Sequence, residues 1–186
     1  MAIVLGLTPF IAFFALMRLV SPLAGLIAAL LASVVLGIRM WQRGESIKAL
    51  EIGSLILFGG LALYTLVAAP VWTVATVRLA VDAGLLAIVV ISLAIGRPFT
   101  LQYAREQVPQ EFWTAPLFIS TNRLITSVWA AAFAVLVAAD AAAEYLPAAV
   151  PLWVDIAASV LALCGAAAFT FWYPARVRRS VGLDLQ

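Results

Sequence analysis

Six long apolar stretches dominate the sequence and constrain its fold more than any other feature. They run from Ile3 to Val20, Leu23 to Ile38, Ile52 to Ala69, Leu79 to Ile95, Leu124 to Ala139 and Trp153 to Tyr173. With 66% hydrophobic residues and a mean hydropathy of +1.13, the chain has too little polar surface to cover a water-soluble globule. Lipid must therefore solvate much of its exterior, and the sequence predicts an all-α, polytopic transmembrane helix bundle.

The length of the stretches sets the expected number of spans. A spanning helix needs about 20 apolar residues, and we expect four of the stretches to meet this length. The first two are short and are joined at Ser21-Pro22, so they form either two short spans or a hairpin that does not fully cross. We expect one bundle domain over residues 1–186 with about six membrane helices. Met1 to Val20 lacks a basic leader region, so we interpret it as retained membrane structure and not a signal peptide.

The distribution of positive charge predicts the orientation. With six helices, Arg and Lys residues gather on one face: Arg39, Arg43, Lys48, Arg97, Arg105, Arg123, Arg176, Arg178 and Arg179. Only Arg18 and Arg78 fall toward the other face. Short loops rich in Arg and Lys remain cytoplasmic, so we expect a multi-pass membrane protein with both termini in the cytoplasm.

The connection between residues 97 and 123 is too polar to span the membrane and too aromatic to be a free linker. Pro98 suits the first turn of a helix, and Phe99 and Tyr103 follow at four-residue spacing. We expect a cytoplasmic interfacial helix that either anchors the bundle or docks a partner or anionic lipid. The candidate contact residues are Arg97, Phe99, Tyr103, Arg105, Phe112, Trp113, Asn122 and Arg123.

Charged residues near the membrane form a second candidate site. Arg78 and Asp82 lie four residues apart and share a helix face, so they could form a structural pair near the end of their helix. Asp140, Glu144 and Asp155 flank the turn from Leu146 to Pro151, where they could gather a cation or simply mark the non-cytoplasmic rim. Alternatively, these five residues line a polar path through the membrane.

The residue inventory excludes most catalytic chemistry. The chain has no His, a single Cys at position 164 and a single Lys at position 48, so it offers no imidazole ligand, no thiolate cluster and no buried Schiff-base lysine. No nucleophile motif or phosphate-binding loop is present. We expect no enzyme activity, no cofactor and no metal, although a lipid-modifying enzyme built on Asp and Arg stays open. The net charge of +2 is too small to predict nucleic-acid binding.

Small residues at four-residue spacing predict where helices approach each other. Gly25 and Ala29, Ala28 and Ala32, and the series Ala130, Ala134, Ala138 and Ala142 form such stripes. Small side chains let backbones come close where no hydrophobic effect drives association. The stripes are expected to pack against protein, unless they only reflect an Ala-rich composition.

The order of several motifs resembles the intracellular septation protein A family of small bacterial inner-membrane proteins. The motifs are Pro9-Phe10 followed by Phe13-Phe14, Phe58-Gly59-Gly60-Leu61-Ala62-Leu63, Trp72 before Thr76, Arg97-Pro98, Asn122, and Trp129 with Phe133. The resemblance covers about Pro9 to Tyr173. It implies a role in cell division and envelope integrity and supplies no catalytic residues.

Three functions remain open at this point. The first is a non-enzymatic membrane protein that supports septation or the envelope through contacts with membrane lipids, protein partners or further copies of itself. The second is a small channel or transporter that uses the polar path. The third is an accessory subunit of a larger membrane complex, favoured by the Ala-rich faces.

Overall fold

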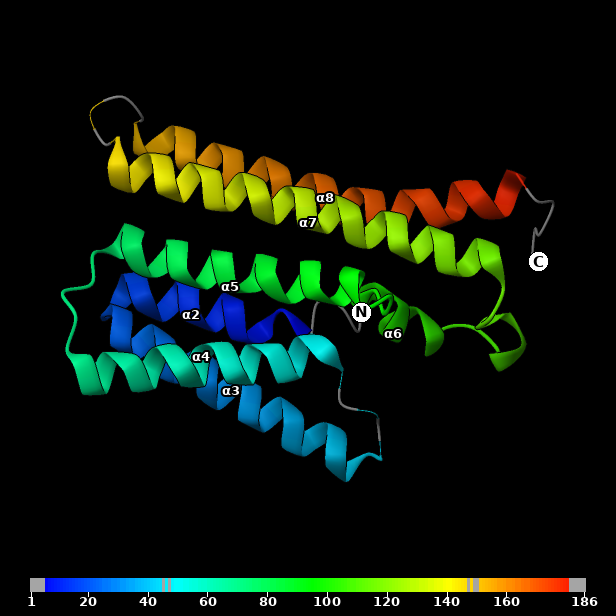
Figure 1. Ribbon diagram of the computed structural model, residues 1–186, viewed down its shortest axis with the longest axis horizontal. Coiled ribbons are helices and arrows are strands. Elements are labelled where there is room, and N and C mark those ends of the chain that lie inside the picture. The colour runs from blue at the N-terminus through cyan, green and yellow to red at the C-terminus, as the bar shows by residue number, and fades with distance from the viewer. Residues whose placement is uncertain (1–5, 45, 47, 147, 149–150, 181–186) are drawn as a thin grey trace. The chain divides into compact units, whose positions relative to one another are not determined.

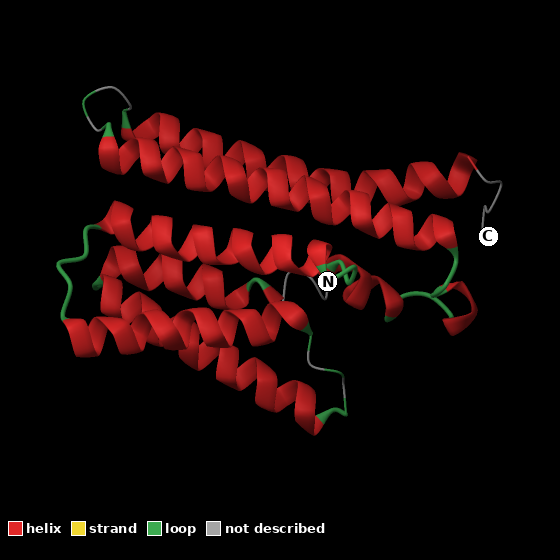
Figure 2. Ribbon diagram, viewed as in Figure 1, coloured by secondary structure: helices red, strands yellow, loops and turns green. Residues whose placement is uncertain are grey.

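The computed structural model describes residues 6–44, 46, 48–146, 148 and 151–180, and this part of the chain is helical without any strand (Figure 2). Figure 1 shows the helices α2 (Thr8–Leu19), α3 (Pro22–Gln42), α4 (Ala49–Ala68), α5 (Val74–Ala94), α6 (Phe99–Arg105), α7 (Pro116–Tyr145) and α8 (Leu152–Ser180), with the 3₁₀ turn η1 (Gln110–Phe112). The predicted all-α bundle is confirmed. Parts of the predicted first stretch and of the Leu146 to Pro151 turn lie outside the described residues.

Five helices are long and apolar enough to cross a membrane: α3, α4, α5, α7 and α8. Helix α2 has 12 residues and is short, as the sequence predicts. The prediction that the second segment is also short is wrong, because α3 has 21 residues. Its first turn is set by Ser21, whose hydroxyl accepts a hydrogen bond from the Ala24 N–H at 3.2 Å. Its last turn continues beyond Ile38 to Gln42 and includes the exposed Arg39 and the buried Met40.

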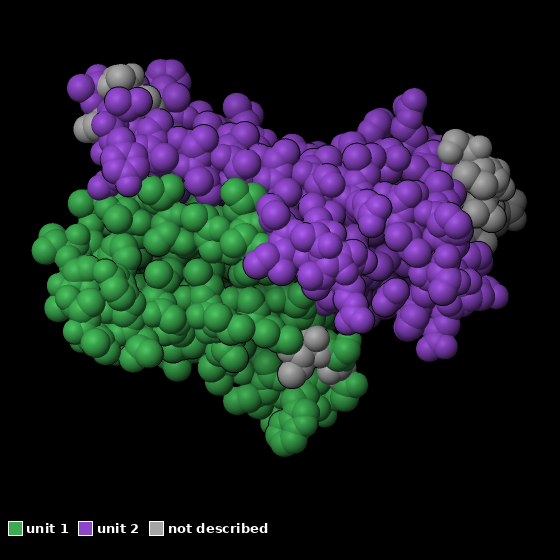
Figure 3. All heavy atoms as spheres, viewed as in Figure 1, with its two compact units in different colours: residues 1–88 green, residues 89–186 purple. Residues whose placement is uncertain are grey.

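The helices fall into two compact units, which Figure 3 colours separately. Unit 1 comprises residues 1–88, which include α2, α3, α4 and most of α5. Unit 2 comprises residues 89–186, which include the end of α5, α6, α7 and α8. The sequence predicts one bundle domain over both units.

Close approach of helices organises unit 1. A Cβ added at Gly25 in α3 would lie 2.9 Å from both the Cβ of Met17 and the carbonyl oxygen of Phe13, both in α2. Gly25 and Ala29 are buried, so the first predicted small-residue stripe is confirmed. Between α4 and α5 the contact is reciprocal. Ile88 of α5 lies over Gly53 of α4, where an added Cβ would be 2.7 Å from the Ile88 Cδ1 atom. In return, Leu57 of α4 lies over Gly84 of α5.

An aromatic cluster joins α2 to α4 within unit 1. The ring centroids of Phe10 and Phe58 are 5.0 Å apart, and those of Phe13 and Phe58 are 5.8 Å apart. Phe13 and Phe58 are fully buried. Offset and tilted aromatic pairs at these distances contribute about 0.5–1.5 kcal/mol beyond their buried area. The cluster therefore holds the short α2 against α4.

Hydrogen-bonded contacts organise unit 2, where α7 and α8 form an antiparallel hairpin (Figure 1). The indole N–H of Trp129 in α7 donates to the Thr170 hydroxyl of α8 at 2.9 Å. Trp129, Phe133 and Leu136 line the buried face of α7. Ala134 and Ala138 of the predicted Ala stripe are exposed, so these two residues do not form the contact with α8. The large side chains, and not the small ones, occupy the helix contact here.

Both hairpin helices extend beyond their apolar stretches. The sequence predicts a span that begins at Leu124, but α7 begins at Pro116 and has 30 residues. At 1.5 Å per residue it is about 45 Å long, against a hydrocarbon core of about 30 Å. Helix α8 continues through Pro174 to Ser180, past the predicted end at Tyr173. Each of these helices is therefore longer than the hydrocarbon core is thick.

Candidate functional site

The predicted interfacial segment begins with a tight connection after α5. Gly96 adopts a φ of +70°, a left-handed conformation that glycine tolerates without strain. The Ser92 hydroxyl donates to the Val89 carbonyl at 2.7 Å and accepts from the Phe99 N–H at 3.2 Å. One buried serine thus pairs the first backbone N–H of α6 and ties this helix to the end of α5.

Threonine hydroxyls dock α6 on α7. Thr100 Oγ1 lies 2.7 Å from the Thr126 hydroxyl and donates to the Asn122 carbonyl at 3.0 Å. Phe99 and Tyr103 share one face of α6, as their spacing predicts, with ring centroids 6.4 Å apart. They are 2% and 1% exposed, and Asn122 is 3% exposed. These three predicted contact residues therefore face the interior of the protein and offer no surface to a lipid or partner.

Trp113 closes the loop that follows α6. Its indole N–H is shared between the carbonyl oxygens of Arg105 and Val108, each at 3.1 Å. The guanidinium of Arg105 lies over the indole ring, 5.5 Å from its centroid. A cation in this position is attracted to the ring face. Trp113 and Arg105 therefore stabilise the loop between α6 and α7.

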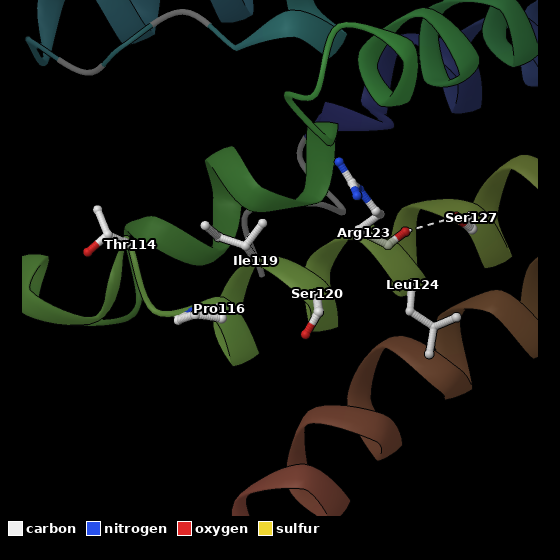
Figure 4. A pocket seen from close by; sticks show the side chains of 7 residues that line it. All are labelled: Thr114, Pro116, Ile119, Ser120, Arg123, Leu124 and Ser127. Carbon is white, nitrogen blue, oxygen red and sulfur yellow. Dashed lines mark hydrogen bonds between the residues drawn. The ribbon is translucent and has the colours of Figure 1, made fainter.

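The remaining predicted contact residues face outward. Arg97 and Arg123 are exposed, and Phe112 is 44% exposed. A shallow hollow of about 590 Å³ lies along the first turns of α7 (Figure 4). It is lined by Thr114, Pro116, Ile119, Ser120, Arg123, Leu124 and Ser127. We call the outward residues Arg97, Phe112 and Arg123, together with this hollow, the basic rim.

The end of α8 adds further basic and aromatic groups at the same level of the hairpin. The two helices are antiparallel, and Trp129 of α7 bonds Thr170 of α8. Arg123 lies six positions before Trp129, and Arg176 lies six positions after Thr170. The two arginines are therefore at the same level along the hairpin. The Arg176 guanidinium lies 5.4 Å from the centroid of the Trp172 ring. Phe169 and Tyr173 stack at 5.0 Å. Aromatic and basic groups in this pattern are typical of a membrane interface.

The predicted polar-path residues are mostly buried. In unit 1, Arg78 is 7% exposed and Asp82 is 1% exposed, both in the first half of α5. In unit 2, Asp140 is fully buried and Asp155 is 1% exposed, whereas Glu144 is partly exposed. Asp140 and Asp155, which could mark a non-cytoplasmic rim, are thus shielded by the protein. Within the described residues, no group of three or more His, Cys, Asp or Glu side chains could hold a metal ion.

Comparison of the chain with protein-family models, curated proteins and solved structures finds no match. The residues that carry the family resemblance can still be located in the structure. Phe10, Phe13 and Phe58 form the aromatic cluster of unit 1. Trp72 donates to the Thr65 hydroxyl at 2.8 Å, and Trp129 donates to Thr170. These motif residues stabilise the fold.

Sequence reasoning missed the residues that position the basic rim. Ser92, Thr100, Thr126 and Thr170 are ordinary hydroxyl residues within or beside apolar helices. Their partners lie 7 to 41 residues away along the chain, so spacing alone gives no signal. Their apolar surroundings were the available hint, because a hydroxyl in a lipid-embedded helix usually bonds either its own backbone or a neighbouring helix.

Proposed function

We propose that this chain is a non-enzymatic multi-pass membrane protein that acts through contacts of its basic rim with membrane lipids and protein partners. The observation that carries the proposal is the rim itself. Arg97, Phe112 and Arg123 face outward, and hydrogen bonds of the Ser92 and Thr100 hydroxyls dock α6, the helix between Arg97 and Phe112 in the chain. A docked element that presents exposed arginines and an exposed aromatic ring suits recognition more than a free connection does.

The proposed setting is the bacterial inner membrane, with the basic rim in the cytoplasm. At one end of the α7/α8 hairpin lie Arg123, Arg176, Arg178 and Arg179, and toward the other end lie Asp140, Glu144 and Asp155. This asymmetry supports a cytoplasmic rim because Arg-rich short segments are retained on that side. The resemblance to septation proteins supports a role in cell division or envelope maintenance.

Cysteine labelling tests the orientation. In a Cys164→Ser background, we expect a membrane-impermeant maleimide to modify Ala148→Cys, beside the α7/α8 turn, in intact cells. Gln110→Cys, beside the basic rim, should react only after permeabilisation. Both positions are exposed, so access to the reagent depends on the side of the membrane. The reverse pattern would contradict a cytoplasmic rim.

Complementation in cells tests the function. We expect deletion of the gene to produce elongated or envelope-sensitive cells, and the double variant Arg97→Gln/Phe112→Ala to fail to restore them at normal membrane abundance. The matched control Arg18→Gln/Ile11→Ala also alters an exposed arginine and an exposed apolar side chain, but in α2. It should complement fully. Full complementation by the rim variant would reject the proposal.

A second candidate function, a small channel or transporter, is favoured by the burial of Asp82 and Asp140. Ionisable groups inside apolar helices are costly, and those that persist often serve ion or proton paths. If this function holds, ion or proton flux in proteoliposomes should fall at least tenfold on Asp82→Asn or Asp140→Asn, while Glu111→Gln, an exposed carboxylate in η1, should leave it unchanged. Flux equal to that of empty vesicles would exclude this candidate.

A further inference from the structure

The hollow at the start of α7 combines one guanidinium, three hydroxyls and an apolar edge. Arg123 carries the only charge among the seven residues that line it, and none of the seven is a carboxylate. Thr114, Ser120 and Ser127 supply the hydroxyls, and Pro116, Ile119 and Leu124 supply the apolar surface. Figure 4 shows these side chains along the start of one helix and the turn before it.

We infer that this hollow binds the phosphate of an anionic phospholipid from the surrounding leaflet. The inference rests on the proposed function and names the lipid class and the residues involved. Arg123 offers five N–H donors in a planar fork that matches phosphate oxygens. The exposed Thr114 hydroxyl can donate as well. The Ser120 hydroxyl now donates to the Leu117 carbonyl at 3.1 Å and is exposed, so it can rotate toward a ligand.

The apolar side of the hollow distinguishes a lipid from free phosphate. Ile119 and Leu124 are next to the polar groups, and Leu124 is 42% exposed. Leu117, on the same first turns, is 45% exposed. Free phosphate gains nothing from such surfaces, whereas the glycerol backbone and first acyl carbons of a phospholipid would cover them. The site therefore fits an amphiphile with a phosphate head.

The position of the hollow along the hairpin supports an anionic headgroup. Arg123 is level with Arg176 of α8, and Arg178 and Arg179 follow within the same helix turn. Basic side chains at a leaflet surface attract anionic lipids. Each such side chain raises the affinity for the lipid by about fivefold. The first residue of the hollow, Thr114, directly follows Trp113, which the loop contacts hold in place.

Native mass spectrometry of the full chain in mild detergent tests this inference, with phosphatidylglycerol and phosphatidylcholine as probes. We expect preferential retention of phosphatidylglycerol and a loss of affinity of about fivefold or more in Arg123→Gln. Ile119→Trp, which fills the hollow without changing charge, should cause a comparable loss. Arg39→Gln is the matched control, because Arg39 is exposed but belongs to α3. Gel filtration and circular dichroism would confirm that each variant is folded.

Arg123→Lys separates a built site from diffuse attraction. Lysine retains the charge and loses the planar fork, so we expect only partial recovery of phosphatidylglycerol binding. Full recovery by Lys, or unchanged binding in both Arg123→Gln and Ile119→Trp, would overturn the inference. Competition by millimolar inorganic phosphate would do so too, because it would identify free phosphate as the ligand. The proposed function fails separately, if the Arg97→Gln/Phe112→Ala variant complements in cells.

Discussion

Units 1 and 2 are both made of apolar helices, yet different contacts hold their helices together. In unit 1 the helices approach through glycine positions, where Met17 lies against Gly25 and Ile88 against Gly53. In unit 2 the prominent contacts are hydrogen bonds between side chains, from Trp129 to Thr170 and between Thr100 and Thr126. Both solutions suit a lipid solvent, in which the hydrophobic effect does not drive helices together.

Because their helix contacts differ, the two units should respond differently to substitution. Close packing around a glycine depends on shape, so an added methyl group forces backbones apart and costs about 1–3 kcal/mol. An interhelical hydrogen bond in a membrane protein contributes less, on average about 0.6 and at most about 1.7 kcal/mol. Unit 1 should therefore be sensitive to added volume, and unit 2 to the loss of polar partners.

The largest expected effect is on the α2/α3 contact. Gly25→Ala should lower the free energy of unfolding by about 1–3 kcal/mol, because the new methyl group meets the Met17 Cβ and the Phe13 carbonyl, both at 2.9 Å. The matched control is Gly37→Ala in the same helix, where nothing lies within 4 Å of the added methyl group. The control should be neutral or slightly stabilising. Unfolding in mixed SDS micelles measures both, and equal effects would contradict the close-approach argument.

Next in size is the Trp129–Thr170 bond of unit 2. Trp129→Phe should destabilise the protein by about 1 kcal/mol, because the indole N–H donor is lost from a buried helix contact. Thr170→Val removes the acceptor, and in a double-mutant cycle the two changes should couple by a similar amount. Trp153→Phe is the control, because Trp153 is 70% exposed. Additive effects of the two changes would show that the bond contributes nothing.

How far the sequence predicts the fold depends on which physical rule sets each boundary. Hydropathy correctly indicates the all-α class and the short α2, because lipid exposure requires apolar side chains. It misplaces the start of α7, because Arg123 interrupts the apolar run but not the helix, whose backbone bonds continue from Pro116. It misplaces the end of α8 for a similar reason, since aromatic and basic residues at the interface continue the helix past Pro174. Hydropathy marks the hydrocarbon region, and helices extend beyond it.

The candidate site is predictable in composition but not in orientation. The spacing of Phe99 and Tyr103 correctly places them on one face of α6. Nothing in the spacing says whether that face meets lipid or protein, because an aromatic ring suits both. The Thr100–Thr126 contact turns the face inward, and its two residues lie 26 positions apart. Only the folded arrangement shows that Arg97, Phe112 and Arg123 are the residues left outside.

A smaller effect is expected from the threonine pair that docks α6. Thr100→Val alone should cost about 0.6 kcal/mol and increase hydrogen exchange at the amides of residues 99–105, because the bonds to Thr126 and to the Asn122 carbonyl are lost. Adding Thr126→Val should recover part of the loss, since both buried hydroxyls are then absent. Thr114→Val, an exposed control, should leave exchange unchanged. No change in exchange with Thr100→Val would indicate that other contacts dock this helix.

The smallest expected effect concerns the backbone of unit 1 and not its side chains. Ala69 ends α4 in a left-handed conformation, with φ 42° and ψ 48°. A left-handed conformation costs a residue with a Cβ about 1 kcal/mol, and glycine avoids this cost. Glycine, however, loses more backbone entropy on folding, which costs about 0.5 kcal/mol. Ala69→Gly should therefore raise the free energy of unfolding by about 0.5 kcal/mol. The control Ala87→Gly lies within α5 and is exposed, so it should lower stability by a similar amount. In the same micelle assay, a gain of stability for Ala69→Gly and a loss for Ala87→Gly would show that the left-handed backbone of Ala69 is strained. A loss of stability in both variants would contradict this.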